Sequence, residues 1–89
     1  MTKQEASRLL HQSELKATQN RISVLQFLDK QKYPIGVEKV LAHFKQMDKV
    51  TAYRILASLE EKGIVKKYNI GHDHFDYELT NRKHHHHVI

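Results

Sequence analysis

One segment of this chain has clear limits at both ends, and it constrains the fold more than any other. Asp48 can cap the start of a helix, and Gly63 stands where a left-handed residue commonly ends one. Ile64 follows the glycine and can fold back on Leu59, the contact that accompanies a Schellman ending. Residues 49–62, between these limits, are therefore predicted to form a helix.

The predicted helix has two different faces when its residues are placed about 100° apart. One face gathers the apolar side chains that must pack on the rest of the domain, namely Ala52, Ile55, Leu56 and Leu59. The opposite face carries Lys49, Val50, Thr51, Tyr53, Arg54, Ala57 and Ser58. Arginine can bond both O6 and N7 of guanine, and tyrosine and valine can contact thymine methyl groups. This second face is therefore a candidate for insertion into the major groove of DNA.

Three further helices are predicted before this one. Thr18 offers an N-cap oxygen to the second of them, which the Pro34 and Gly36 region ends. Apolar residues at helical spacing predict the three helices over Thr2 to about Ser13, Gln19 to about Lys32, and Val37 to about Lys45.

The periodicity changes to that of strands after residue 63. Residues Ile64–Ile70 and Phe75–Thr80 alternate, with the tip of a hairpin at Gly71–His74. The second strand is expected to place Phe75, Tyr77 and Leu79 on one face. The predicted fold class is therefore mostly α with a small β-hairpin (α+β), a winged helix-turn-helix of four helices followed by a two-stranded antiparallel wing.

Length and composition limit the kind of protein. With 89 residues, 39% of them hydrophobic, the chain can build one core but not two. The formal charge of +5 suits an anionic partner such as nucleic acid or a membrane surface. No apolar run approaches the roughly 20 residues of a membrane span, and the first residues lack a signal-peptide core. We therefore expect a cytoplasmic protein without a membrane partner.

No motif for catalysis is present. The chain has no cysteine, nucleophile elbow, phosphate-binding loop or HExxH element. The carboxylates Asp73, Asp76 and Glu78 lie beside a predicted loop, where no pocket is expected. The prediction is that the protein is not an enzyme.

Basic residues outside the fourth helix extend the candidate DNA-binding face. Two lie at the start of the second helix and two on the wing, where they could meet phosphates flanking the groove. The predicted DNA-binding residues are Lys16, Arg21, Lys49, Thr51, Tyr53, Arg54, Ser58, Lys66 and Lys67. The alternative makes Tyr53 a half-buried packing residue and Arg54 a solvated or ion-paired one. Helical periodicity does not choose between the two.

Several motifs together resemble the ferric uptake regulator (Fur) family. They are Leu15-Lys16-Ala17-Thr18-Gln19-Asn20-Arg21, Val50-Thr51-Ala52-Tyr53-Arg54, Gly63-Ile64-Val65, Tyr77-Glu78-Leu79 and His84-His85-His86-His87-Val88-Ile89. The resemblance implies a dimeric transcriptional repressor that binds AT-rich inverted repeats of double-stranded DNA when loaded with metal. It implies that Tyr53 and Arg54 contact bases and that Lys16 lies near the minor groove.

The resemblance also implies a site for a divalent metal, with zinc or iron as first candidates and manganese as a further one. Glu78, His85 and His87 match the regulatory site between two domains, and His84 and His86 match a second site. Carboxylate and imidazole ligands suit zinc and ferrous iron. The family often has a histidine before its third helix, where this chain has Tyr33 and Pro34.

The expected domain organisation follows from the same resemblance. Residues 1–83 form the winged-helix DNA-binding domain, and residues 84–89 form a His-rich hinge leading to a dimerisation domain missing from this chain. The metal site is therefore expected to be incomplete here. The full-length protein is expected to be a homodimer, and the 89-residue chain by itself a monomer.

Two alternatives remain open at this point. The histidine run at 84–87 could be a purification tag, although tags usually carry six histidines and the preceding Glu-Leu-Thr fits the family. The domain could also be a winged-helix metal-binding or protein-interaction module that does not distinguish bases. His72 and His74, at the predicted hairpin tip, are interpreted as loop residues rather than ligands.

Overall fold

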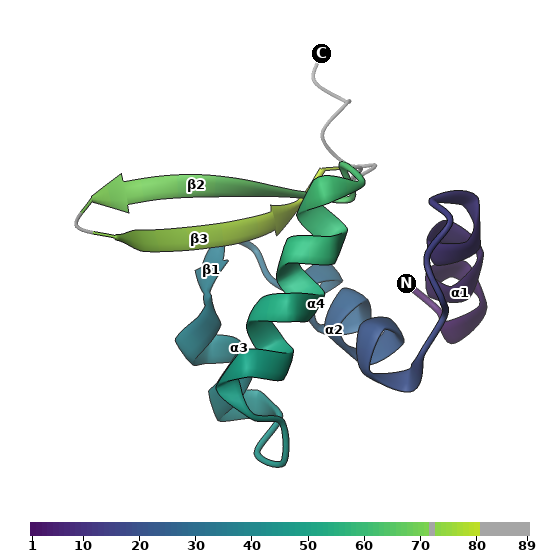
Figure 1. Ribbon diagram of the computed structural model, residues 1–89, viewed down its shortest axis with the longest axis horizontal. Coiled ribbons are helices and arrows are strands. Elements are labelled where there is room, and N and C mark those ends of the chain that lie inside the picture. Colours follow the sequence, from purple (N-terminus) through teal and green to yellow (C-terminus); the bar gives the residue numbers. More distant parts are fainter. Residues whose placement is uncertain (72, 81–89) are drawn as a thin grey trace.

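The computed structural model describes residues 1–71 and 73–80. In this part of the chain the helices are α1 (Lys3–Gln12), α2 (Gln19–Asp29), α3 (Val37–His43) and α4 (Lys49–Glu61), and the strands are β1 (Ile35–Gly36), β2 (Val65–Gly71) and β3 (His74–Leu79). Figure 1 shows the β2–β3 hairpin extending away from the helices, with α4 beside its base. None of the described helices is long and apolar enough to cross a bilayer.

This arrangement confirms the predicted winged-helix fold and adds one strand to the wing. The sheet has the order β1-β3-β2, and both pairings are antiparallel. The short β1 places Ile35 opposite Tyr77 and so ties the segment before α3 to the hairpin. A two-residue strand has no periodicity that a sequence pattern could detect, which is why only two strands were predicted.

The ends of α4 form as predicted. The Asp48 side chain accepts a hydrogen bond from the backbone N–H of Thr51 at 3.2 Å. At the other end, the Ile64 N–H donates to the Leu59 carbonyl at 2.9 Å and the Gly63 N–H donates to the Glu60 carbonyl at 3.0 Å. This pair of bonds defines a Schellman motif, and it depends on the φ of +76° at Gly63.

Replacing Gly63 with alanine is expected to destabilise the domain by roughly 1 kcal/mol. Nothing lies within 4 Å of an added Cβ, so the cost comes from the left-handed backbone and not from a clash. Thermal unfolding followed by circular dichroism measures it. Gly63→Asn is the matched control, because asparagine tolerates this conformation and should lose less. Equal stability of the alanine variant and the wild type would contradict this account of the helix end.

Two helices end earlier than their patterns predicted. The second was predicted to reach about Lys32 but ends at Asp29, and the third was predicted to reach about Lys45 but ends at His43. After α2 the chain must become extended to pair β1 with β3, and Pro34 disfavours helical geometry in the residue before it. The predicted starts at Gln19 and Val37 are correct.

The core lies between the inner face of α4, the other helices and one face of the sheet. All four residues of the predicted apolar face of α4 are buried, and Ala52, Leu56 and Leu59 are fully enclosed. They pack in one cluster with buried residues of the other elements, including Leu10, Leu25, Leu28, Val40, Tyr77 and Leu79. The inward face of α4 is therefore fixed by packing, and this determines which residues α4 turns outward.

Candidate nucleic-acid interface

The outward face of α4 is open to solvent. Val50 is 55% exposed and Tyr53 is 43% exposed, and Lys49, Arg54 and Ala57 are also exposed. The described part of the hairpin does not cover them, and the core does not enclose them. The tyrosine and the arginine that the sequence places next to each other are both accessible on the surface.

The charges of α4 are divided along its length. Lys49 and Arg54 lie in its first half, whereas Glu60 and Glu61 lie in its last turn. The capping Asp48 precedes the helix, where hydrogen bonds from the Thr51 side chain and backbone hold the pKa of its carboxyl below the ordinary value. The half of α4 that bears the exposed tyrosine–arginine pair is thus also its basic half.

The start of α2 contributes a second group of candidate residues. Lys16 is exposed just before the helix, whereas Arg21 is half-buried. The Arg21 guanidinium donates from Nε to the Ser58 hydroxyl at 3.4 Å and from Nη1 to the Lys16 carbonyl at 3.1 Å. Arg21 and Ser58, which the sequence indicated separately as DNA contacts, therefore meet each other where α2 faces α4.

The two wing lysines lie on opposite faces of the hairpin. Lys67 is on the α4 side, where its Nζ lies 4.0 Å from Glu60 Oε1 and 4.6 Å from the centre of the Phe75 ring. This contact links the wing to the last turn of α4. The sequence placed Lys67 near phosphates but did not indicate that it also has an acidic partner within the protein.

Lys66 points to the other face of the sheet, the one it shares with Glu78 through the strand register. On that face the Tyr68 hydroxyl donates to Glu78 Oε1 at 3.0 Å, and this hydrogen bond raises the pKa of Tyr68. Tyr68 was not among the predicted site residues. Its position two residues after Lys66 already placed it on this face, because side chains alternate along a strand.

Tyr77 anchors the wing in the core of the domain. The residue is buried under the base of the hairpin, and burial raises the pKa of its phenol, with smaller contributions from the nearby Tyr53 and Glu60. Two residues of α4, one exposed and one in its last turn, thus contribute to the raised pKa of this wing residue.

Of the predicted metal ligands, Glu78 alone lies among the residues that the structure describes. Its side chain is half-buried near the end of β3 and presents a carboxylate, a group that zinc and iron accept as a ligand. Among residues 1–71 and 73–80 no group of three potential ligands lies together. The other predicted ligands, His84, His85, His86 and His87, lie outside the described residues, as does His72.

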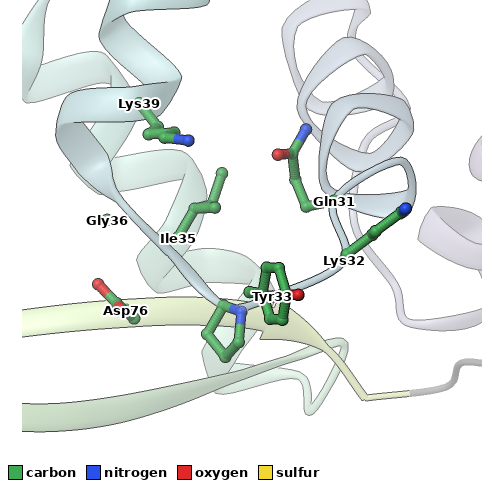
Figure 2. Close-up of a pocket in the computed structure, with 8 residues that line it drawn as sticks. Gln31, Lys32, Tyr33, Ile35, Gly36, Lys39 and Asp76 are labelled. Atoms are coloured by element: carbon green, nitrogen blue, oxygen red, sulfur yellow. The ribbon is translucent and has the colours of Figure 1, made fainter.

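An open hollow of about 260 Å³ lies beside the segment between α2 and β1. Its lining includes Gln31, Lys32, Tyr33, Lys39 and Asp76 (Figure 2). Tyr33 is 74% exposed there, and Asp76 is the lining residue with a carboxylate. The hollow belongs to the α2–β1 connection and lies on the side of β3 away from β2. We assign it no ligand.

These features define a winged-helix domain with a basic, aromatic-bearing half-helix exposed at one side. Residues 12–89 match the model of the ferric uptake regulator family. The chain belongs to this family, which confirms the resemblance seen in its motifs.

Individual relatives agree with this assignment. The chain is 32% identical over 90 residues to the ferric uptake regulation protein of Legionella pneumophila and 32% identical over 85 residues to that of Pseudomonas putida. These alignments cover 96% and 90% of this chain but 66% and 63% of the relatives. The chain thus spans about two thirds of the length of these curated relatives.

Solved structures show the same fold. A manganese-containing ferric uptake regulator from Pseudomonas aeruginosa matches with a TM-score of 0.77 at 27% identity, over 85% of this chain and 60% of that one. The regulator of Vibrio cholerae, whose structure is described as showing a rearrangement of its DNA-binding domains, matches with a TM-score of 0.73 at 25% identity. That match covers 88% of this chain and 63% of the other.

Proposed function

We propose that this chain is the sequence-specific DNA-binding domain of a metal-responsive transcriptional repressor in the cytoplasm, and that it acts without catalysis. The observation that carries the proposal is the exposed pair Tyr53 and Arg54 on the basic half of a helix whose other face is buried. In helix-turn-helix proteins the N-terminal residues of the second helix contact base edges in the major groove. The family membership supports the same role.

The remaining candidate residues have distinct places in this proposal. Lys49 and Thr51 lie at the start of α4, where they would enter the major groove beside Tyr53 and Arg54. Lys16 would meet the flanking DNA backbone or the minor groove. Lys66 and Lys67 would place one charge on each side of the wing. The net charge of +5 attracts the domain to a polyanion such as DNA.

The proposed operator is an AT-rich inverted repeat bound by a homodimer. A single domain of this size presents one recognition helix and would cover one half-site. Two copies related by a twofold axis would read the two halves of a repeat. The isolated chain would therefore bind a half-site only modestly, because it lacks the second contact.

Selection from a pool of random duplexes by the 89-residue chain tests the proposal. The expected result is an enriched AT-rich half-site whose affinity exceeds that of a scrambled duplex of equal length. Measuring both duplexes at several salt concentrations separates base preference from general attraction to phosphates. Weak binding that is equal for all sequences would instead favour a module that does not distinguish bases.

We further propose that Glu78 contributes to a site for zinc or iron, or for manganese as in the structure of the Pseudomonas aeruginosa relative. The predicted His84, His85, His86 and His87 would supply further ligands, and a dimerisation domain would complete the protein. A bound divalent ion would supply positive charge and fix the ligands relative to one another. Glu78 would contribute by holding a carboxylate at the end of β3.

Glu78→Gln is expected to lower the affinity of the chain for zinc by at least about tenfold, because removing a ligand should cost no less than removing an outer partner of one. Isothermal titration with zinc measures the change. Asp76→Asn is the matched control, since it removes one carboxylate from the same face of the same strand. Zinc affinity that is the same in Glu78→Gln and in the wild type would exclude Glu78 as a ligand.

A further inference from the structure

One guanidinium joins two segments that the proposed function places on DNA separately. Arg21 Nε donates to the Ser58 hydroxyl at 3.4 Å, and Arg21 Nη1 donates to the Lys16 carbonyl at 3.1 Å. Ser58 belongs to the second half of α4, and Lys16 precedes α2. A single side chain therefore spans from the Lys16 segment to α4.

The bonds around this guanidinium form a directed chain. The Ser58 hydroxyl donates to the Ile55 carbonyl at 2.8 Å, so its oxygen is oriented to accept from Arg21. The backbone N–H of Arg21 donates to the Thr18 side chain at 3.2 Å, and this bond fixes the backbone from which the Arg21 side chain extends. A guanidinium holds its donors in one rigid plane, and a lysine ammonium could not reproduce this pair of bonds.

Burial agrees with a role inside the protein. Arg21 and Ser58 are both half-buried, whereas Lys16, Tyr53 and Arg54 are exposed. A lysine or arginine that serves mainly to meet phosphates needs a free charged end on the surface. At Arg21 two of the guanidinium nitrogens are already directed at acceptors of the protein.

We propose that Arg21 is a positioning residue that, with Ser58, fixes the spacing between Lys16 and α4 and does not itself contact DNA. The spacing matters because α4 must fit the major groove at the same time as Lys16 meets the neighbouring backbone. A shift of either segment would reduce the preference for the correct bases more than the general attraction to DNA. The inference rests on the proposed function, since it takes Lys16 and α4 as the contacting segments.

The first test uses two substitutions that break the same bridge from its two ends. Arg21→Lys keeps the charge but loses the directed bonds, and Ser58→Ala removes the acceptor. Each is expected to lower the ratio of affinities for the selected and the scrambled duplex by about two- to tenfold, the range of one net hydrogen bond. The double variant should lose no more than Arg21→Lys alone, because Ser58→Ala removes a bond that Arg21→Lys has already removed. Fully additive losses, or a ratio unchanged in Arg21→Lys, would overturn the proposal.

The salt dependence of binding tests the alternative that Arg21 neutralises a phosphate. In that case Arg21→Gln would reduce the slope of log affinity against log salt by about 1, and Arg21→Lys would bind like the wild type. The control is Arg8→Gln, which removes one exposed charge from α1. Our proposal predicts that Arg21→Gln and Arg8→Gln give the same slope. A slope that falls in Arg21→Gln alone would make Arg21 a phosphate contact.

A measurement without DNA separates this inference from the proposed function. In nitrogen-edited NMR spectra of the free chain, the Arg21 Nε–H is expected to be protected from exchange and to lose this protection in Ser58→Ala. Rapid exchange in the wild type would overturn the bridge whatever the DNA experiments show. If no duplex is selected while the protected Nε–H is present, the proposed function fails and the bridge between α2 and α4 remains.

Discussion

Replacing Arg54 with alanine is expected to cost about 1–3 kcal/mol of affinity for the selected duplex and to relax the preference for its sequence. The reason is that an arginine in the major groove bonds both acceptors of a guanine, and alanine offers no donor to replace that pair of bonds. Affinities of the variant for the selected duplex and for single-base changes of it, at one fixed salt concentration, give the result.

The control for Arg54→Ala is Lys16→Ala. Lys16 is exposed at the start of α2 and is proposed to meet the backbone, so its loss should weaken binding to all duplexes to a similar extent. The two variants remove one positive charge each but should differ in base preference. If Arg54→Ala leaves both the affinity and the preferred sequence intact, Arg54 does not read bases and the proposed role of α4 is wrong.

Leu56→Ala is expected to destabilise the domain by about 2–5 kcal/mol, because it leaves a cavity in the centre of the core. Leu56 is completely buried beneath the outward face of α4. A domain of this size has a total stability of roughly 5–15 kcal/mol, so the substitution removes a large part of it. Chemical denaturation followed by circular dichroism measures the free energy of unfolding.

Val50→Ala on the same helix is the matched control for the loss of core packing. Val50 is 55% exposed, so removing its methyl groups should change the free energy of unfolding by less than about 0.5 kcal/mol. A similar loss of stability in both variants would mean that α4 does not bury the face described here. The orientation of Tyr53 and Arg54 would then have to be reconsidered.

The sequence was most informative where a strong local pattern determines the structure. The limits of α4 follow from a cap, an apolar repeat and a glycine, all within one segment of the chain. The same repeat determined which residues of α4 are buried, and therefore which are exposed. The repeat predicted that Tyr53 and Arg54 lie on the outward face of α4, but it did not decide between exposure and partial burial, and the packing of the whole domain leaves both exposed.

Features that depend on distant parts of the chain could not be derived in the same way. The strand β1 has two residues, and only its pairing with β3 makes it a strand. The bond between Arg21 and Ser58 joins residues 37 positions apart, and nothing in either local pattern indicates it. Sequence alone therefore indicated both residues as exposed contacts, whereas packing brings them together.

The wing shows an intermediate case. Alternation correctly placed Phe75, Tyr77 and Leu79 on one face of the hairpin. The same alternation places Lys66 and Lys67 on opposite faces of the hairpin. The partner of each lysine, however, depends on how the hairpin packs against α4. The contact of Lys67 with Glu60 is thus a property of the assembled domain.

The unequal charges along α4 have a kinetic consequence. Within α4, a polyanion attracts the end with Lys49 and Arg54 and is repelled by the last turn with Glu60 and Glu61, a repulsion that Lys67 at 4.0 Å from Glu60 offsets in part, so long-range forces act on the helix as a torque. The domain would arrive at a duplex already turned in one direction, before any base is touched. A larger fraction of the collisions would then occur in the productive orientation. Added salt would weaken this alignment by screening and would therefore slow productive encounters.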